Sequence, residues 1–185
     1  MTGFYFAFLA VLLAGLGARD QATVANLTLR QGARLGVLAM GIAVSVATAA
    51  VAAWAASLIA PMLPPAARLF LAAFALGLAG SEALLLSPRN KPKEPTHSLG
   101  AFGIVILAQQ LGDAARFLVF ATAVATNAPI PAGVGGAVAG VALLAAGWFA
   151  PESVGQPLLR KLRRAIGAVM LLLAIYLGGS VMIGL

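Results

Sequence analysis

The chain has no cysteine, a single histidine and few charged side chains. Only 9% of its 185 residues are charged, where a soluble domain would carry roughly 25%. The absence of cysteine excludes disulfides and thiolate metal sites. The sequence also lacks a Ser/His/Asp set, a phosphate-binding glycine loop and a paired-histidine metal helix. We therefore expect neither an enzyme nor a bound cofactor.

Apolar residues dominate the rest of the chain, at 62% of the sequence with a mean hydropathy of +1.01. A water-soluble core cannot bury this much apolar surface, so lipid is the predicted solvent. The apolar runs are long and do not alternate with polar residues, which favours helices over a β-barrel. At about 20 residues per crossing, six helices and short loops fill the chain. The basic residues fall between the apolar runs, which indicates contact with membrane lipid and not with nucleic acid.

Prolines and charged clusters divide the chain into helices. A polar linker with three prolines, residues 88–98, separates a first unit, 1–87, from a second, 99–185. The first apolar run is interpreted as a mature transmembrane helix and not as a signal peptide, because it lacks a basic start. The six predicted helices cover residues 3–18 with a weaker continuation to 29, then 35–59, 66–86, 99–126, 132–149 and the stretch that follows the basic residues 160–164 and reaches Leu185.

The two units share landmarks in the same order. Leu16-Gly17 matches Leu111-Gly112, both tryptophans lie in similar phase, and four such landmarks recur at separations between 90 and 99 residues. Each unit has three predicted helices, an odd number, so the second unit crosses the membrane in the opposite sense. The predicted fold is an all-α membrane protein of six transmembrane helices, arranged as two inverted three-helix repeats.

The basic residues predict the orientation. Nine basic residues fall in loops that would share one face of the membrane. The opposite face would have Arg68 alone. Because Lys and Arg favour the cytoplasmic side, both termini are predicted outside, in a bacterial inner membrane. The stretch 160–164 is expected to contact lipid phosphates. The nine residues are Arg30, Arg34, Arg89, Lys91, Lys93, Arg160, Lys161, Arg163 and Arg164.

Charged residues inside the apolar runs mark the candidate site. Asp20 and Asp113 lie near the middle of the first and fourth predicted helices, with Arg19 and Arg116 close by. Such charges are costly at membrane depth, so they seldom persist without a role. In one interpretation the two aspartates and two arginines simply pair. In the other, the aspartates bind a cation or a proton, and an arginine acts as counter-ion when the site empties.

Further residues complete the candidate site. Gly17 and Gly112 are expected to allow close packing or a helix break. Glu82, in the third predicted helix, is either an interfacial carboxylate or a gate. Additional oxygen ligands, suited to a hard cation, are predicted from Gln21, Asn26, Gln109 and Gln110.

The segment around Arg19 resembles a motif of a known transporter family. The Golgi-type manganese/calcium cation:proton antiporter family (the transmembrane protein 165 family, in the lysine-exporter superfamily) carries Glu-x-Gly-Asp-Lys/Arg-Ser/Thr in its first and fourth helices. Here Gly17 and Arg19 match, while Gly15, Ala18 and Asp20 replace the glutamate, the aspartate and the hydroxyl residue. Gln21 also fits the residue that often follows the motif.

The second copy of the motif is also partial. Gly112 and Asp113 match, while Gln110, Ala114 and Ala115 replace the glutamate, the basic and the hydroxyl residues. The resemblance covers nearly the whole chain and implies six helices in two inverted repeats, with acids that carry metal and exchange protons. Both motif glutamates are missing.

These observations predict a transporter that exports a cation, most simply Mn²⁺ or Ca²⁺ in exchange for H⁺, with Asp20 and Asp113 as metal ligands. A small zwitterion whose carboxylate meets Arg19 or Arg116, and a membrane scaffold without transport, are the alternatives. Glycine-rich stretches such as Gly133 to Gly136 would permit helix contacts within one chain or in a homodimer.

Overall fold

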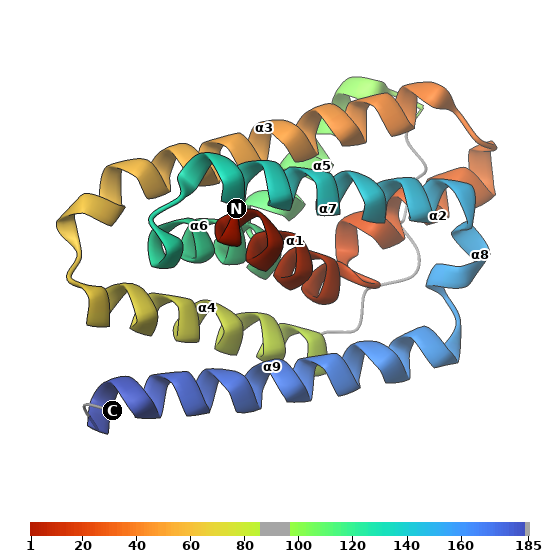
Figure 1. Ribbon diagram of the computed structural model, residues 1–185. Coiled ribbons are helices and arrows are strands. Elements are labelled where there is room, and N and C mark those ends of the chain that lie inside the picture. The colour runs from red at the N-terminus through yellow and green to blue at the C-terminus, as the bar shows by residue number, and fades with distance from the viewer. Residues whose placement is uncertain (86–96, 184–185) are drawn as a thin grey trace.

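The computed structural model describes residues 1–85 and 97–183, and every regular element in these ranges is a helix (Figure 1). The predicted all-α class is therefore confirmed. The elements are α1 (Thr2–Gly15), α2 (Arg19–Gln31), α3 (Leu35–Ile59), the short 3₁₀ helix η1 (Ala60–Met62), α4 (Pro65–Leu85), α5 (Leu99–Leu111), α6 (Ala114–Thr126), α7 (Pro129–Phe149), α8 (Pro151–Val154) and α9 (Pro157–Ile183).

Four of these helices are long and apolar enough to cross a membrane: α3 with η1, α4, α7 and α9. Two further pairs qualify only jointly, because α1 and α2 are bent by 57° and α5 and α6 by 53° at a short break. The described residues thus contain four candidate spans, or six if each bent pair is one span. The first and fourth predicted helices are both interrupted, at Gly17 and Gly112, the glycines for which the sequence suggested close packing or a helix break.

Local sequence explains most of the helix ends. Prolines 61, 64 and 65 end α3 and begin α4, and the Ser98 hydroxyl caps α5 by accepting from the Ala101 N–H at 3.3 Å. The last helix starts earlier than predicted, at Pro157, and includes the basic stretch 160–164. Most of the linker, with its three basic residues, lies outside the described residues.

The long helices form two antiparallel pairs, α3 with α7 and α4 with α9 (Figure 1). The broken spans lie between these pairs, where α1 packs on α6 and α7, and α5 packs on α3. Small residues permit close crossings. A Cβ at Gly80 would lie 2.7 Å from the Gly167 carbonyl oxygen, so only glycine fits where α4 crosses α9.

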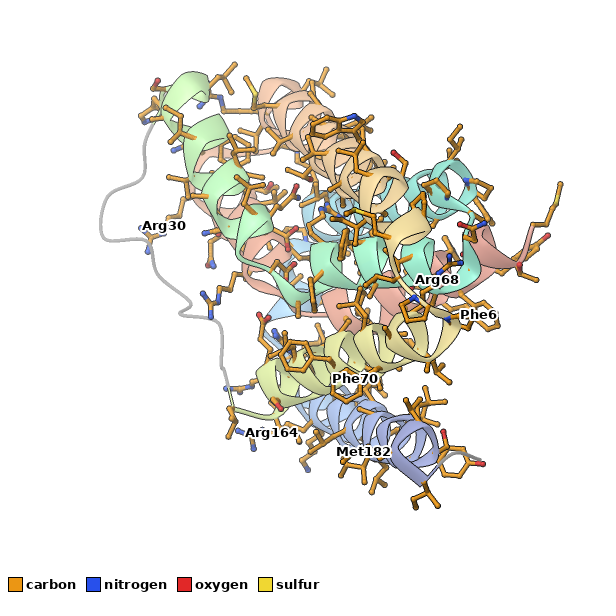
Figure 2. All side chains as sticks on the ribbon, turned by 90° about the vertical axis from the view of Figure 1, so that its left-hand side faces the viewer. Phe6, Arg30, Arg68, Phe70, Arg164 and Met182 are labelled. Atoms are coloured by element: carbon orange, nitrogen blue, oxygen red, sulfur yellow. The ribbon has the colours of Figure 1, made fainter. Side chains whose placement is uncertain are left out.

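Large apolar side chains cover the outside of the bundle. Seen along the bundle, Phe70 and Met182 project outward from α4 and α9 (Figure 2), and 81% of Met182 is exposed. Such a surface is compatible with lipid as the surrounding solvent and with a multi-pass membrane protein.

The two ends of the bundle differ in charge. At one end Arg34 donates to the His97 carbonyl and accepts, through its own carbonyl, from the Trp148 indole N–H at 3.2 Å. Exposed Arg30 and Arg164 belong to this basic end. At the other end Arg68 bonds the Leu63 carbonyl, where α4 begins. The C-terminus lies at this second end (Figure 1).

Candidate functional site

The two breaks lie against each other inside the bundle. The Gln110 side-chain amide on α5 donates to the Asp20 carboxylate on α2 at 3.0 Å, and the Gln109 amide donates to the Thr23 hydroxyl at 3.1 Å. Asp20 and Asp113, 93 residues apart in sequence, thereby reach one small cavity of about 10 Å³. A cavity of that size is at the lower limit for one water molecule. Its lining residues are Arg19, Asp20, Glu82, Gln109, Gly112 and Asp113.

Side chains satisfy the backbone at the first break. Gly17 has φ of +68°, a conformation that favours glycine. The Gln21 side chain accepts from the Gly17 N–H at 2.7 Å and donates to the Leu143 carbonyl on α7 at 3.0 Å. The Gly17 carbonyl accepts from the guanidinium of Arg163 on α9. Within a bilayer such freed backbone groups must find partners, and here they come from α2 and α9.

At the second break, carboxylates accept from the free backbone N–H groups at the start of α6. Asp113 is the N-cap of α6, with its carboxylate 3.4 Å from the Ala115 N–H. Glu82 on α4 accepts from the Ala114 N–H at 3.2 Å. Both carboxylates therefore sit at the positive end of the α6 dipole, which stabilises negative charge.

A buried network connects these acids to α3. Arg116 is 6% exposed and donates to the hydroxyls of Ser45 and Thr48, each at 2.8 Å. Thr48 lies 2.9 Å from the Gln110 side-chain oxygen, and Gln110 in turn holds Asp20. The network therefore joins α6, α3, α5 and α2 around one buried guanidinium.

The charges are balanced but not paired as the sequence suggested. Neither Arg19 nor Arg116 lies within ion-pair distance of an aspartate in the described residues. The ion pair at the site joins Arg163 to Glu82 at 3.9 Å, which is long for a charge-assisted contact. Three arginines (19, 116, 163) and three acids (20, 82, 113) make the cluster neutral when all are ionised.

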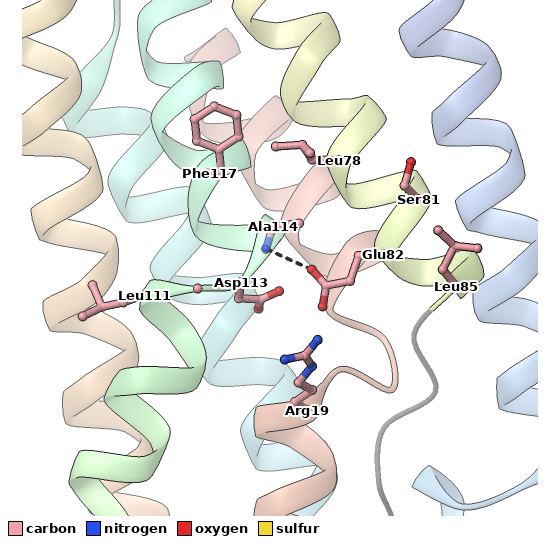
Figure 3. Close-up of a pocket in the computed structure, with 10 residues that line it drawn as sticks. Arg19, Leu78, Ser81, Glu82, Leu85, Leu111, Asp113, Ala114 and Phe117 are labelled. Atoms are coloured by element: carbon pink, nitrogen blue, oxygen red, sulfur yellow. Dashed lines mark hydrogen bonds between the residues drawn. The ribbon is translucent and has the colours of Figure 1, made fainter.

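A wider cavity of about 550 Å³ adjoins the small one and is shown in Figure 3. Arg19, Glu82 and Asp113 point toward one another at its base. Most of its remaining lining is apolar, and it includes Leu85 and Leu111, the exposed last residues of α4 and α5.

Toward the end of the bundle that carries Arg68, buried apolar side chains pack beside the breaks. Val11 of α1, Val119 of α6 and Ala139 of α7 form one fully buried cluster. Ala7 and Val124 belong to a second buried cluster farther along the same helices. The charged cluster therefore lies between the wider cavity and these buried apolar clusters.

Three predicted roles need correction. Gln21 is not placed as an ion ligand, because both ends of its amide are engaged by backbone groups. Asn26 lies away from the small cavity and lines a hollow of about 130 Å³ beside Glu152. Arg163 was expected at the lipid surface but is 5% exposed and faces the first break, while Arg160 and Arg164 are exposed. The face of the helix on which a residue lies decides whether its side chain reaches the site, and residue type alone does not give that face.

The structure also adds residues that sequence reasoning missed. Ser45 and Thr48 were passed over as part of an apolar run, although polar residues three positions apart on a span share a face. Arg163 shares a face with the buried residues Gly167, Met170 and Ala174, and that spacing was the available signal.

The carboxylates of the cluster do not form a ready metal-binding group. In the described parts of the chain, no group of three or more His, Cys, Asp or Glu is placed to hold one. The three carboxylates line the small cavity without being arranged as ligands of a single ion. Asp20 and Asp113 alone thus do not form a ready divalent site in this conformation.

Known proteins provide no independent assignment. Comparison with protein-family models, with curated proteins and with solved structures found no match.

Proposed function

We propose that this protein is a secondary transporter that moves a cation in exchange for protons through the junction of the two broken spans. The observation that carries the proposal is the small cavity between the breaks, lined by Asp20, Glu82 and Asp113 from three different helices. Discontinuous helices at mid-membrane supply the ion sites of many secondary transporters. Carboxylates at that depth can hold either a cation or a proton.

An inverted repeat is the second part of the proposal. A Cβ at Gly140 of α7 would collide with the Ser45 hydroxyl of α3. These residues are 95 positions apart, the same offset that aligns Gly17 with Gly112. A close contact between nearly equivalent positions of α3 and α7 is what two inverted units related by a two-fold axis would have, so it supports the repeat. The basic end would face the cytoplasm of a bacterial inner membrane, with both termini outside.

Arg19 is placed to promote release of the bound cation from the carboxylates. It lines both cavities and is exposed, and its guanidinium has no ion-pair or hydrogen-bond partner in the described residues. It is therefore free to act as a tethered counter-ion that approaches the acids when the cation leaves. In this proposal Arg19 competes with the transported ion, which keeps binding weak enough for turnover.

The substrate class follows from the charges and from the family resemblance. Asp20, Asp113 and the Gln109 carbonyl are oxygen donors, and the resemblance implies Mn²⁺ or Ca²⁺. A divalent ion would require the carboxylates to draw closer than they are here. A small zwitterion is the second candidate, because the unpartnered Arg19 beside two acids offers both charges that such a solute needs.

Reconstituted vesicles test the proposal. Vesicles containing a metal or pH indicator would be challenged with Mn²⁺, Ca²⁺, Na⁺ and amino acids. Cation entry with opposite proton movement is expected for the native chain and should fall to background in Asp20→Asn and Asp113→Asn. Glu152→Gln is the matched control, because this acid is exposed and remote from the small cavity. Amino-acid flux would favour the zwitterion, and no flux from a folded protein would favour a scaffold.

A further inference from the structure

Arg163 is buried in a helical segment whose other basic residues are exposed. Arg160, Lys161 and Arg164 all face outward from α9, whereas Arg163 is 5% exposed. A buried guanidinium costs several kcal/mol unless specific acceptors compensate it. Its acceptors belong to two other elements, the Gly17 carbonyl at the first break and Glu82 on α4.

Glu82 extends this connection to the second break. One of its carboxylate oxygens lies 3.9 Å from Arg163, and the other accepts from the Ala114 N–H at the start of α6. A continuous chain of polar contacts thus runs from Gly17 through Arg163 and Glu82 to Ala114. It links the two breaks from the side, through the α4–α9 pair.

We infer that Arg163 is a positioning residue that couples the two breaks, so that a change at Glu82 is transmitted to Gly17. The inference rests on the proposed function for its purpose. Glu82 lines the small cavity, so a cation that draws in its carboxylate would loosen Arg163. The first break would then lose the donor that holds its carbonyl.

Two details indicate that the contact between Arg163 and Glu82 can break and re-form. The Arg163–Glu82 separation is near the limit of an ion pair, and the Arg163 Nε is buried without an acceptor in the described part of the chain. A permanent structural anchor would be expected to use its donors more fully. Arg163 is thus held in place chiefly by two groups, one at each end of the connection.

Hydrogen exchange tests the coupling without any need for transport. Glu82→Gln removes the charge but keeps an oxygen to accept from the Ala114 N–H, so the second break retains its cap. Exchange of backbone amides in residues 12–22 of the reconstituted protein should nevertheless accelerate by about tenfold or more, because local opening at the first break becomes easier. Arg163→Gln should give the same acceleration, and the double variant no further increase.

Controls separate coupling from general loosening. Arg164→Gln removes the same charge from the adjacent exposed position and should leave residues 12–22 unchanged. Arg163→Lys retains the charge but cannot reach both acceptors from one ammonium group, so it should behave like Arg163→Gln. If Glu82→Gln leaves the first break unchanged, or if the two single effects add in the double variant, the inference is overturned.

A second readout distinguishes this inference from the transport proposal. The chain has no cysteine, so Ser81→Cys places one thiol in the wall of the wider cavity. Mn²⁺ or Ca²⁺ should slow its reaction with a water-soluble maleimide severalfold, and Arg163→Gln should abolish that response. A response that survives Arg163→Gln contradicts the coupling. No cation response in the parent contradicts the transport proposal, while the exchange experiment still decides the coupling.

Discussion

Replacement of Thr48 by valine should destabilise the protein more than its small size suggests. The hydroxyl accepts from Arg116 Nε at 2.8 Å and lies 2.9 Å from the Gln110 side-chain oxygen, and the residue is 3% exposed. Valine fills nearly the same volume, so no cavity opens. The change therefore removes hydrogen bonds without changing the packing, and besides the network these include the contact of the hydroxyl with the Val44 carbonyl of its own helix at 2.9 Å.

The expected loss can be worked from those two contacts. A hydrogen bond from a charged donor contributes about 1.5–3 kcal/mol. A neutral bond between membrane helices averages only about 0.6 kcal/mol, because the unfolded chain in lipid also finds partners. The charged contact therefore dominates, and Thr48→Val should lower the free energy of unfolding by about 2–3 kcal/mol. Arg116 would keep its hydrogen bond to the Ser45 hydroxyl, so the buried guanidinium retains one acceptor.

Thermal unfolding of the purified protein in detergent measures this loss. Thr126→Val is the matched control, because the Thr126 hydroxyl donates to the Thr122 carbonyl within its own helix. The control should cost well under 1 kcal/mol, since only an intrahelical contact of a threonine is removed. Similar unfolding temperatures for Thr48→Val and Thr126→Val would refute the argument that the network anchors Arg116.

Two further predictions concern release of the ion and the crossing of α4 with α9. Arg19→Gln should lower the apparent KM for the transported cation by about tenfold in vesicle assays, since like charges in one small site at an effective dielectric near 20 repel by on the order of 1–2 kcal/mol. An unchanged or higher KM would contradict the role of Arg19 as a competitor. Gly80→Ala should destabilise by about 1–3 kcal/mol in thermal unfolding, because its Cβ would lie 2.7 Å from the Gly167 carbonyl oxygen and 2.8 Å from the Leu171 N, both backbone atoms. Gly77→Ala, one turn earlier, meets only an ordinary 3.6 Å contact and should be neutral or slightly stabilising; equal losses would contradict the close crossing.

Local signals made much of this fold predictable. The span from residue 35 to 59 coincides with α3, because a continuous apolar run ends at Pro61 and neither feature depends on distant parts of the chain. The glycines at 17 and 112 marked both breaks, and Asp20 and Asp113 stood out by charge alone. Such features are visible because a charged or helix-breaking residue is conspicuous in an apolar background.

Rotation of each helix was less predictable. Arg163 and Arg164 are adjacent and carry the same charge, yet one is buried and the other exposed. Only the position of α4 decides which of them turns inward. Gln21 was equally plausible as an ion ligand until α7 placed the Leu143 carbonyl beside it. Chemistry selected the candidates, but packing between distant segments assigned their roles.

Many of the buried polar side chains gather here because they bond the backbone groups that the two helix breaks leave free. Other polar groups at the site have no such role. Backbone groups engage Gln21, Glu82 and Arg163, so these residues have a structural reason to be buried. The Arg19 guanidinium and the second carboxylate oxygen of Asp113 have no hydrogen-bond partner in the described residues, and both residues line the small cavity. Hydrogen bonding to the free backbone groups at the breaks does not account for the position of these two groups. Their placement together at the small cavity is what the proposed site for a charged solute requires.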